Sequence, residues 1–436
     1  MHRRSLAPVA LGAALALAAT ACSCATSGQA RSGTAGGKTL TVWYMDGDLS
    51  SQAQNAIDTA FEKATGAKVR VQIQEWDDIN TKISTALAQD NPPDVLEIGN
   101  TDVPLFAATG ALSDITAHRA QLAGGQSWLP GLVGPATVDG KLYAAPLFAG
   151  NRAVIYNKKI WGAAGVSTAP ASFAELTADL DKIKKANASP GFSAFYFPGQ
   201  YWYGALQFVW AAGGQLAVQN GGSWSGALES AAAQQGLAAW KSFQNTYSTA
   251  ASRDADTKSP DQAALFADGK AAAILDTSVN TVLKDAASHG DNALKDQIGT
   301  FPLPGAAPGT TQPVFLGGSD LAIAAKSPNQ DLALAYLKAA TSVSVQTGAI
   351  VGTDGWTPVS TQLIDQTSGS LSATSQAFAA AAKRSVATPA TPGWATIESD
   401  KSINAFFADI ATGRKSVAQA AKDFDAHLDQ ALNAAQ

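Results

Sequence analysis

Apolar residues in the first hundred positions recur with two alternating periods. Short runs rich in β-branched and aromatic residues occupy 38–44, 69–73 and 94–98, as expected of strands in a sheet. Between them, apolar positions within 53–64 and 79–87 recur three or four residues apart, the spacing of an amphipathic helix. A βαβαβ succession requires a parallel sheet with right-handed crossovers. The pattern therefore predicts an α/β fold.

The stretch 141–157 interrupts this alternation. Its first half is a short apolar segment that we expect to end at Pro146, whose ring fixes φ and removes a ladder donor. An exposed polar turn at 150–152 follows, and then a buried strand at 153–156. Two strands with no helix between them are natural where a chain leaves one sheet and enters another. We therefore predict a crossing between two lobes here, with the polar turn at the mouth of a cleft, and a second crossing at 301–304.

The N-terminus has the pattern of an export signal. Residues 3–21 combine two arginines, an apolar run and small residues, and Cys22 follows directly. This segment resembles the lipobox of bacterial lipoproteins, in which that cysteine takes lipid and becomes the new N-terminus. An ordinary signal peptide cut nearby is the alternative. Residues 22–37 are mostly Ser, Gly, Thr and Ala, so we expect a flexible tether to the outer face of the cell membrane.

Composition excludes several functions. The chain of 436 residues has 46% hydrophobic and 15% charged residues, as in globular proteins of two or three domains. Its 30 basic and 35 acidic residues include no basic block, so nucleic acid is not an expected partner. No cysteine follows Cys24, which excludes disulfide and thiol chemistry in the folded part. The four histidines are scattered, and common catalytic motifs are absent, so we expect no metal, no cofactor and no enzyme.

Seven short motifs, in this order, resemble the carbohydrate-binding proteins of ABC importers, the group that includes maltose-binding proteins. The resemblance covers the chain from about residue 38 to its end. The motifs are Leu-Thr-Val-Trp at 40–43, Pro-Asp-Val-Leu-Glu at 93–97, Lys-Leu-Tyr-Ala-Ala-Pro at 141–146, Ile-Tyr-Asn-Lys at 155–158, Phe-Ala-Asp-Gly-Lys-Ala-Ala-Ala at 266–273, the glycine pair 317–318 before Leu-Ala-Ile, and Trp-Thr-Pro at 356–358.

The resemblance implies a two-lobed fold of the periplasmic-binding-protein type II, with hinge crossings and a sugar between the lobes. It implies an N-terminal lobe of 38–147 and 303–343 and a C-terminal lobe of 148–302 and 344–436. A third crossing is expected near 341–346. Such a protein, expected to be a monomer, captures its sugar by lobe closure and delivers it to the permease subunits of an ABC transporter. Two stretches, 97–101 and 149–156, look most like actinobacterial lipoproteins for N,N'-diacetylchitobiose and related amino sugars.

A sugar site needs flat aromatic rings against C–H faces and Asp, Asn, Glu or Arg against hydroxyls. Trp356, in a Gly-rich loop stopped by proline, fits stacking better than core packing, and the lone carboxylate of Asp320 needs a partner. Polar residues at strand ends could instead cap the following helices. The candidate ligand-binding residues are Tyr44, Asp46, Trp76, Asn100, Thr101, Asp102, Asn151, Arg152, Trp202, Tyr203, Asp276, Asn280, Gly318, Ser319, Asp320 and Trp356.

Two other functions remain open at this point. The acidic rim of the predicted cleft could suit a cation, so a receptor for a polyamine or a peptide is the first alternative. A secreted glycoside-acting enzyme is the second, because its two carboxylates have no fixed spacing in a sequence.

Overall fold

The computed structural model describes residues 37–434. The predicted signal peptide, the lipid attachment at Cys22 and nearly all of the predicted tether lie outside the described residues.

The predicted βαβαβ unit is confirmed in the first lobe. β1 (Thr39–Met45) pairs in parallel with both β2 (Lys68–Gln74) and β3 (Val95–Gly99). The connections are the helices α1 (Ser51–Thr65) and α2 (Ile79–Ala88). Since β1 lies between β2 and β3 and runs parallel to both, the carboxyl ends of all three strands lie at one edge of the sheet.

Local signals define α1 at both ends. The side chain of Ser50 caps the helix by accepting from the backbone N–H of Ala53. Gly66 ends it in the left-handed region at φ 73°, which glycine adopts without strain. Ile57 and Phe61 face the sheet and are fully buried.

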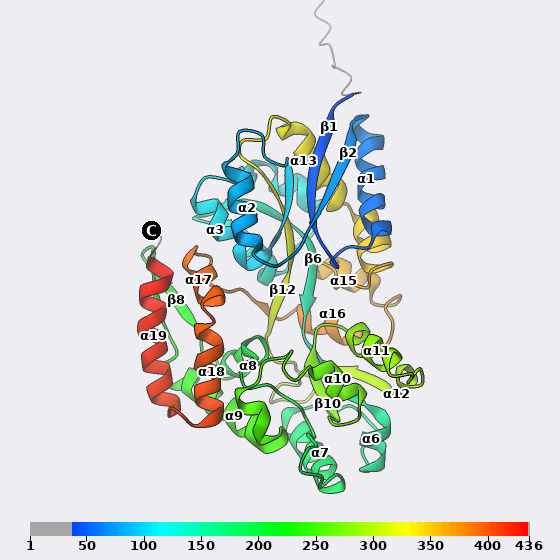
Figure 1. The fold of residues 1–436 in the computed structure, drawn as a ribbon, viewed down its shortest axis with the longest axis vertical. Helices are drawn as coiled ribbons and strands as arrows, with labels where there is room; N and C mark the ends of the chain where they lie inside the picture. Colours follow the sequence, from blue (N-terminus) through cyan, green and yellow to red (C-terminus); the bar gives the residue numbers. More distant parts are fainter. Residues whose placement is uncertain (1–36, 435–436) are drawn as a thin grey trace, which may run out of the picture. The chain divides into compact units, whose positions relative to one another are not determined.

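Three later strands complete the first sheet. β12 (Val314–Ile323) pairs antiparallel with β3, and β6 (Ala144–Asn151) pairs antiparallel with β12. The short β13 (Ser385–Val386) adds in parallel to the start of β12. Figure 1 shows β6 and β12 descending together from this sheet toward the second lobe.

The second lobe has its own antiparallel sheet. β7 (Ala153–Asn157) lies between β10 (Ala273–Asp276) and β11 (Ile298–Phe301). β6 ends at Asn151 and β7 begins at Ala153, so one residue, Arg152, separates a strand of the first sheet from a strand of the second. The predicted crossing at this point is therefore confirmed.

Two details of the predicted crossing are wrong. The strand does not end at Pro146, because β6 continues through it to Asn151. Pro146 lies opposite Asp320 at a register shift in β12, and a proline is tolerated at such an irregularity because no ladder donor is needed. The turn is also not exposed, since Asn151 is buried and its amide donates to the carbonyl oxygen of Phe378.

The apolar cores agree with two lobes. One core comprises residues of β1, β3, β6, α1 and α13, and a second comprises residues of α7, α8, α9, α18 and α19, with a smaller third core behind β7 and β10. The first core also contains Val345, Ile350, Val359 and Leu363, which lie in the segment 344–436 that the resemblance places in the C-terminal lobe.

The remaining elements surround these sheets. With the first core lie η1 (Asn100–Asp102), α3 (Val103–Ala108), η2 (Thr116–His118), α4 (Arg119–Ala123), α5 (Pro130–Val133), β4 (Thr137–Val138), β5 (Lys141–Leu142), α13 (Gln330–Ala340), α14 (Val343–Val345), the π-helix η4 (Gln346–Val351) and α15 (Thr361–Thr367).

The others pack in the second lobe, where α17, α18 and α19 contact one another (Figure 1). They are α6 (Lys158–Ala163), α7 (Phe173–Ala186), α8 (Trp202–Ala211), β8 (Ala217–Asn220), β9 (Ser223–Gly226), α9 (Ala231–Tyr247), η3 (Ala250–Asp254), α10 (Gln262–Ala267), α11 (Val279–Ser288), α12 (Leu294–Gln297), α17 (Gly393–Ser399), α18 (Ser402–Thr412) and α19 (Val417–Asn433), while α16 (Gln376–Ala382) contributes to the first and third cores.

Candidate functional site

A cavity of about 480 Å³ lies where β6 and β12 leave the first sheet. We call it the cleft cavity. Its lining joins the carboxyl edge of the first sheet to α8 and α17 of the second lobe. Nine of the predicted site residues line it, namely Trp76, Asn100, Thr101, Asp102, Arg152, Tyr203, Gly318, Ser319 and Trp356.

Trp76 presents an aromatic surface to the cleft cavity. The residue follows β2 and keeps 40% of its surface exposed, which is unusual for a tryptophan. A Cβ at Gly99 would lie 3.6 Å from two ring carbons, which is van der Waals contact, so the indole lies beside the end of β3. An exposed indole held at a cavity wall is suited to stacking against the C–H face of a sugar.

Arg152 occupies the crossing itself. Its Nε donates to the hydroxyl oxygen of Tyr201 at 3.1 Å, and its guanidinium lies 4.2 Å from the ring centroid of Tyr203 and 5.3 Å from that of Phe315. Its Nη1 is buried and has no hydrogen-bond partner in residues 37–434. A buried donor without a partner costs free energy, so a ligand oxygen that accepted from Nη1 would recover it.

Two carboxyl groups, those of Asp102 and Glu398, line the cleft cavity. Asp102 of η1 accepts from the amide of Asn80 at 3.1 Å, and Glu398 of α17 accepts from the hydroxyl of Thr101 at 2.9 Å. Burial raises the pKa of Asp102 to about 6. Burial, and secondly the charge of Asp102, raise the pKa of Glu398 to about 8. Glu398 therefore holds its proton at neutral pH.

A second acidic pair lies at the end of β1. Glu97 is fully buried and accepts from the backbone N–H of Met45 at 2.9 Å. Burial, and then the charge of Asp48, raise its pKa well above the ordinary value. Burial also raises the pKa of Asp48, which lines the cleft cavity. Both groups consequently favour their neutral forms more than exposed carboxyls do.

Trp356 lies between the cleft cavity and a second cavity and lines both. Its Nε1 donates to the carbonyl oxygen of Asp48 at 2.8 Å, and its ring stacks on Phe148 with centroids 4.3 Å apart. The second cavity, the side cavity, has a volume of about 740 Å³ and is also lined by Asn280 and residues of α11 and α16. Asp48, Gly150, Thr277 and Trp356 line both cavities, so the two are neighbours.

Six predicted site residues lie outside both cavities: Tyr44, Asp46, Asn151, Trp202, Asp276 and Asp320. The geometry does not support ligand contacts for them. Asp46 is exposed on the loop after β1. Asp48, two residues further along that loop, lines the cleft cavity where Asp46 was expected.

Four of the six have packing or hydrogen-bonding partners elsewhere. Tyr44 is fully buried with its hydroxyl 2.8 Å from that of Tyr336, because its face of β1 is covered by helices. Trp202 is 3% exposed and packs edge-on against Phe315 and Trp394. Asn151 donates to Phe378, as noted above, and Asp276 accepts from the amide of Gln262 at 2.9 Å.

Asp320 is the exception, since it has no partner. Its residue is fully buried, and neither carboxyl oxygen forms a hydrogen bond with any described residue. Burial raises the pKa of Asp320 well above its ordinary value. No side chain of residues 37–434 is therefore the expected partner, and a ligand contact of Asp320 stays a prediction. Its burial favours the neutral form of the acid.

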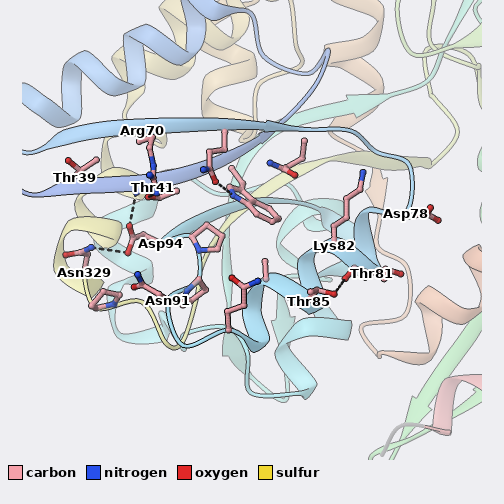
Figure 2. A pocket seen from close by; sticks show the side chains of 18 residues that line it. Thr39, Thr41, Arg70, Asp78, Thr81, Lys82, Thr85, Asn91, Asp94 and Asn329 are labelled. Carbon is pink, nitrogen blue, oxygen red and sulfur yellow. Dashed lines mark hydrogen bonds between the residues drawn. The ribbon is translucent and has the colours of Figure 1, made fainter. Parts of the chain in front are cut away.

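A larger hollow of about 930 Å³ lies away from the crossing, between the face of β1 and β2 and the helix α2 (Figure 2). Its polar groups bond mainly with one another. Trp43 donates to Gln72 at 2.7 Å, Arg70 donates to Thr41 at 3.0 Å, and the carboxylate of Asp94 accepts from the backbone N–H of Thr41 at 2.8 Å. With these groups satisfied, the hollow is a weaker candidate than the cleft cavity.

Residues 37–434 contain no group of three His, Cys, Asp or Glu residues placed to hold a metal ion. They also contain no helix long and apolar enough to cross a membrane.

A cavity between two α/β lobes, at the point where strands cross from one to the other, defines a solute-binding protein. The chain belongs to the family of bacterial extracellular solute-binding proteins, whose sequence profile matches residues 46–347. Over 398 residues, 91% of this chain and 90% of the relative, it is 37% identical to the diacetylchitobiose binding protein DasA of Streptomyces coelicolor.

Solved structures of sugar-binding proteins share the fold. The sugar-binding protein MalE from Xanthomonas citri superposes with a TM-score of 0.78 at 23% identity, covering 91% of this chain and 97% of that one. The GacH receptor of Streptomyces glaucescens, solved unliganded and with acarbose, gives 0.71 at 22% identity, covering 91% and 98%. At these identities the likeness establishes the two-lobed fold alone.

Proposed function

We propose that the protein captures an amino-sugar oligosaccharide, of the N,N'-diacetylchitobiose type, in the cleft cavity and delivers it to an ABC importer. The observation that carries the proposal is the buried, unpartnered Nη1 of Arg152 in the same cavity as the exposed indole of Trp76. The extensive similarity to the diacetylchitobiose binding protein supports the choice of sugar.

An acetamido group matches the unsatisfied atoms of this cavity. Its carbonyl oxygen can accept from Nη1 of Arg152, and its N–H can donate to a buried acceptor. Oδ1 of Asn80 is such an acceptor, because it is buried without a hydrogen-bond partner in the part of the chain that is described. Rings stacked on Trp76 and on the free surface of Trp356 would supply the apolar contacts.

The binding would favour lobe closure. A ligand shifts a conformational equilibrium only by its differential affinity for the two states, so it must contact both lobes in the closed form. Trp76 and Asn80 belong to the first lobe and Tyr203 to the second, with Arg152 at the crossing. A sugar that spans these residues meets the requirement.

A ligand panel tests the proposal. Chito-, malto-, xylo- and cello-oligosaccharides are screened by thermal shift, since a ligand that binds only the native state raises the melting temperature. Hits are then measured by calorimetry. We expect N,N'-diacetylchitobiose to bind with a Kd of about 1 μM or below, about −8 kcal/mol. If no chito-oligosaccharide shifts melting while another class does, the choice of sugar is overturned.

A polyamine is the second candidate, because Asp48, Asp102 and Glu398 line the cleft cavity and Glu97 lies next to Asp48. The pKa of about 8 for Glu398 opposes this interpretation, because a protonated acid attracts a cation weakly. Spermidine in the same panel separates the candidates. A melting shift with spermidine and none with sugars would replace the proposal.

We propose binding without cleavage. A glycosidase requires one carboxylate that is ionised as base or nucleophile beside one that is protonated. Asp102 and Glu398, with pKa values of about 6 and about 8, do not by themselves distinguish binding from cleavage. The support for binding is the family of extracellular solute-binding proteins and the similarity to a diacetylchitobiose binding protein. Incubation with N,N'-diacetylchitobiose followed by chromatography should return only the intact disaccharide, and the appearance of N-acetylglucosamine would contradict this proposal.

We further propose that the protein is exported and held at the outer face of the membrane by lipid on Cys22, as a monomer. The support is the signal-like sequence of residues 3–21 and the family, whose members are extracellular. Expression of wild type and Cys22→Ala with a labelled fatty acid tests the anchor. Wild type should carry the label and the variant should not. If neither carried the label, lipid attachment at Cys22 would be excluded.

A further inference from the structure

The cleft cavity contains a direct contact between the lobes. Thr101 lies in η1 beside the first sheet, whereas Glu398 lies in α17, whose Trp394 and Ile397 belong to the second core. The hydroxyl of Thr101 donates to Oε2 of Glu398 at 2.9 Å. The two lobes are therefore joined by a hydrogen bond at the cavity wall.

Glu398 was not among the residues expected from the sequence, and its surroundings are unfavourable to its charge. It is partly buried, Asp102 next to Thr101 is of like sign, and both line the same cavity. Burial and the charge of Asp102 outweigh the hydrogen bond from Thr101, so the pKa of Glu398 rises to about 8. The hydrogen bond alone would have lowered it.

Groups on the other elements around α17 do not neutralise Glu398. Tyr203 of α8 faces it as a phenol, and the presence of Glu398 raises the pKa of that phenol further. α18 and α19 also pack against α17, and His427 of α19 lies 3.3 Å from the carboxylate of Asp400 rather than near Glu398. Arg152 lines the same cavity but stacks on Tyr203. No ion pair with Glu398 occurs in residues 37–434.

We propose that Glu398 is a closure-determining residue: as a neutral acid it holds α17 against Thr101 of the first lobe, and loss of its proton beside Asp102 opens the cleft and weakens sugar binding. Its consequence for ligand affinity rests on the proposed function. Its consequence for the free protein does not, because the hydrogen bond joins two groups of this chain.

The direction of the pH effect follows from proton linkage. When the lobes separate, Glu398 gains solvent and loses its neighbour, so its pKa returns toward the ordinary value. The open form then releases a proton that the closed form retains, and closure weakens as pH rises from the ordinary carboxyl range through about 8. Below the ordinary carboxyl range Glu398 is protonated in both the open and the closed form, so its titration no longer weakens closure.

The test measures lobe separation in the full chain without ligand. Because no cysteine follows residue 24, Lys82→Cys on α2 and Lys185→Cys on α7, both exposed, can carry spin labels in a Cys22→Ala, Cys24→Ala background. We expect the label distance distribution to move to longer values between about pH 5.5 and about pH 8.5. In Glu398→Gln, which stays neutral and can still accept from Thr101, most of this shift should disappear.

Two further variants make the result specific. Asp102→Asn removes the like charge, so the midpoint of the distance change should move to lower pH. Glu229→Gln, an exposed residue outside both cavities, should behave as wild type. A wild-type distance independent of pH, or a full pH response in Glu398→Gln, overturns the proposal. Affinity for N,N'-diacetylchitobiose, measured in parallel, should fall about tenfold or more over the same range in wild type and Glu229→Gln but not in Glu398→Gln, since one pKa unit corresponds to tenfold.

Discussion

The indole N–H of Trp356 donates to the backbone carbonyl of Asp48 across 2.8 Å, although the two residues are 308 positions apart in the chain. This bond, with the stacking of the indole on Phe148, orients the ring at the boundary between the cleft cavity and the side cavity. The ring is thus positioned before a ligand arrives, which reduces the entropy lost on binding.

Replacement of this ring should weaken binding. We expect Trp356→Ala to lower affinity for the sugar at least tenfold, about 1.4 kcal/mol, as measured by calorimetry. Folding should change little, because the residue is only partly buried. Trp356→Phe keeps the stacking but loses the hydrogen bond to Asp48, so its affinity for the sugar should lie between those of wild type and Trp356→Ala. An unchanged affinity in Trp356→Ala would remove the residue from the site.

Trp76→Ala tests the other aromatic wall. Since 40% of Trp76 is exposed, the variant should melt at nearly the wild-type temperature while its affinity falls about tenfold, the scale of one well-placed aromatic contact. Ile73→Ala is the matched control, because Ile73 is 47% exposed on β2, the strand that precedes Trp76, but lies outside both cavities. Equal losses of affinity in the two variants would refute the assignment.

The sequence predicted the fold better than it predicted the site. Alternating periods in the first hundred residues, and the run of β-branched residues after Asn151, depend on local chemistry and were sufficient for the sheets and the crossing. Asp48 could not be chosen over Asp46 because the choice depends on the turn at Gly47, whose φ is 82°. Glu398 carries no signal at all, since it lies in an ordinary helical segment.

The boundaries between the lobes were also difficult to predict from the sequence. Val345 and Val359 are apolar residues that either core could accept, and their place in the first core follows only from tertiary packing. We therefore propose that the N-terminal lobe extends to about residue 364. Limited proteolysis that releases a fragment ending near 344 with an intact first core would contradict this boundary.

Arg152→Met retains an apolar stem for stacking on Tyr203 but has no donor for a ligand. We expect a loss of affinity of about tenfold to a hundredfold, because hydrogen bonds to charged groups contribute about 1.5–3 kcal/mol. The control is Arg70→Met in the hollow of Figure 2, for which affinity should be unchanged. If Arg70→Met abolished binding and Arg152→Met did not, the site would have to be moved to that hollow.

Asp320 should make stability depend on pH. Burial raises its folded-state pKa well above the ordinary value, whereas the unfolded chain titrates in the ordinary range. The unfolded state therefore loses the proton first, and the free energy of unfolding falls as pH rises above that range. Asp320→Asn has no such proton, so we expect it to exceed wild type by about 1 kcal/mol or more near pH 7 and by less near pH 4.

Urea denaturation at several pH values measures this difference. Asp90→Asn, an exposed carboxyl, is the control and should follow the wild-type curve. Parallel curves for Asp320→Asn and wild type over the whole range would show that the buried acid does not affect stability.

The central claim is that the cleft cavity holds the sugar, and a crystal structure of the protein grown with N,N'-diacetylchitobiose tests it most directly. We predict density for the disaccharide against Trp76, with an acetamido oxygen within hydrogen-bond distance of Nη1 of Arg152. Sugar density confined to the hollow beside α2, or a cleft cavity filled only by water at saturating sugar, would contradict the account.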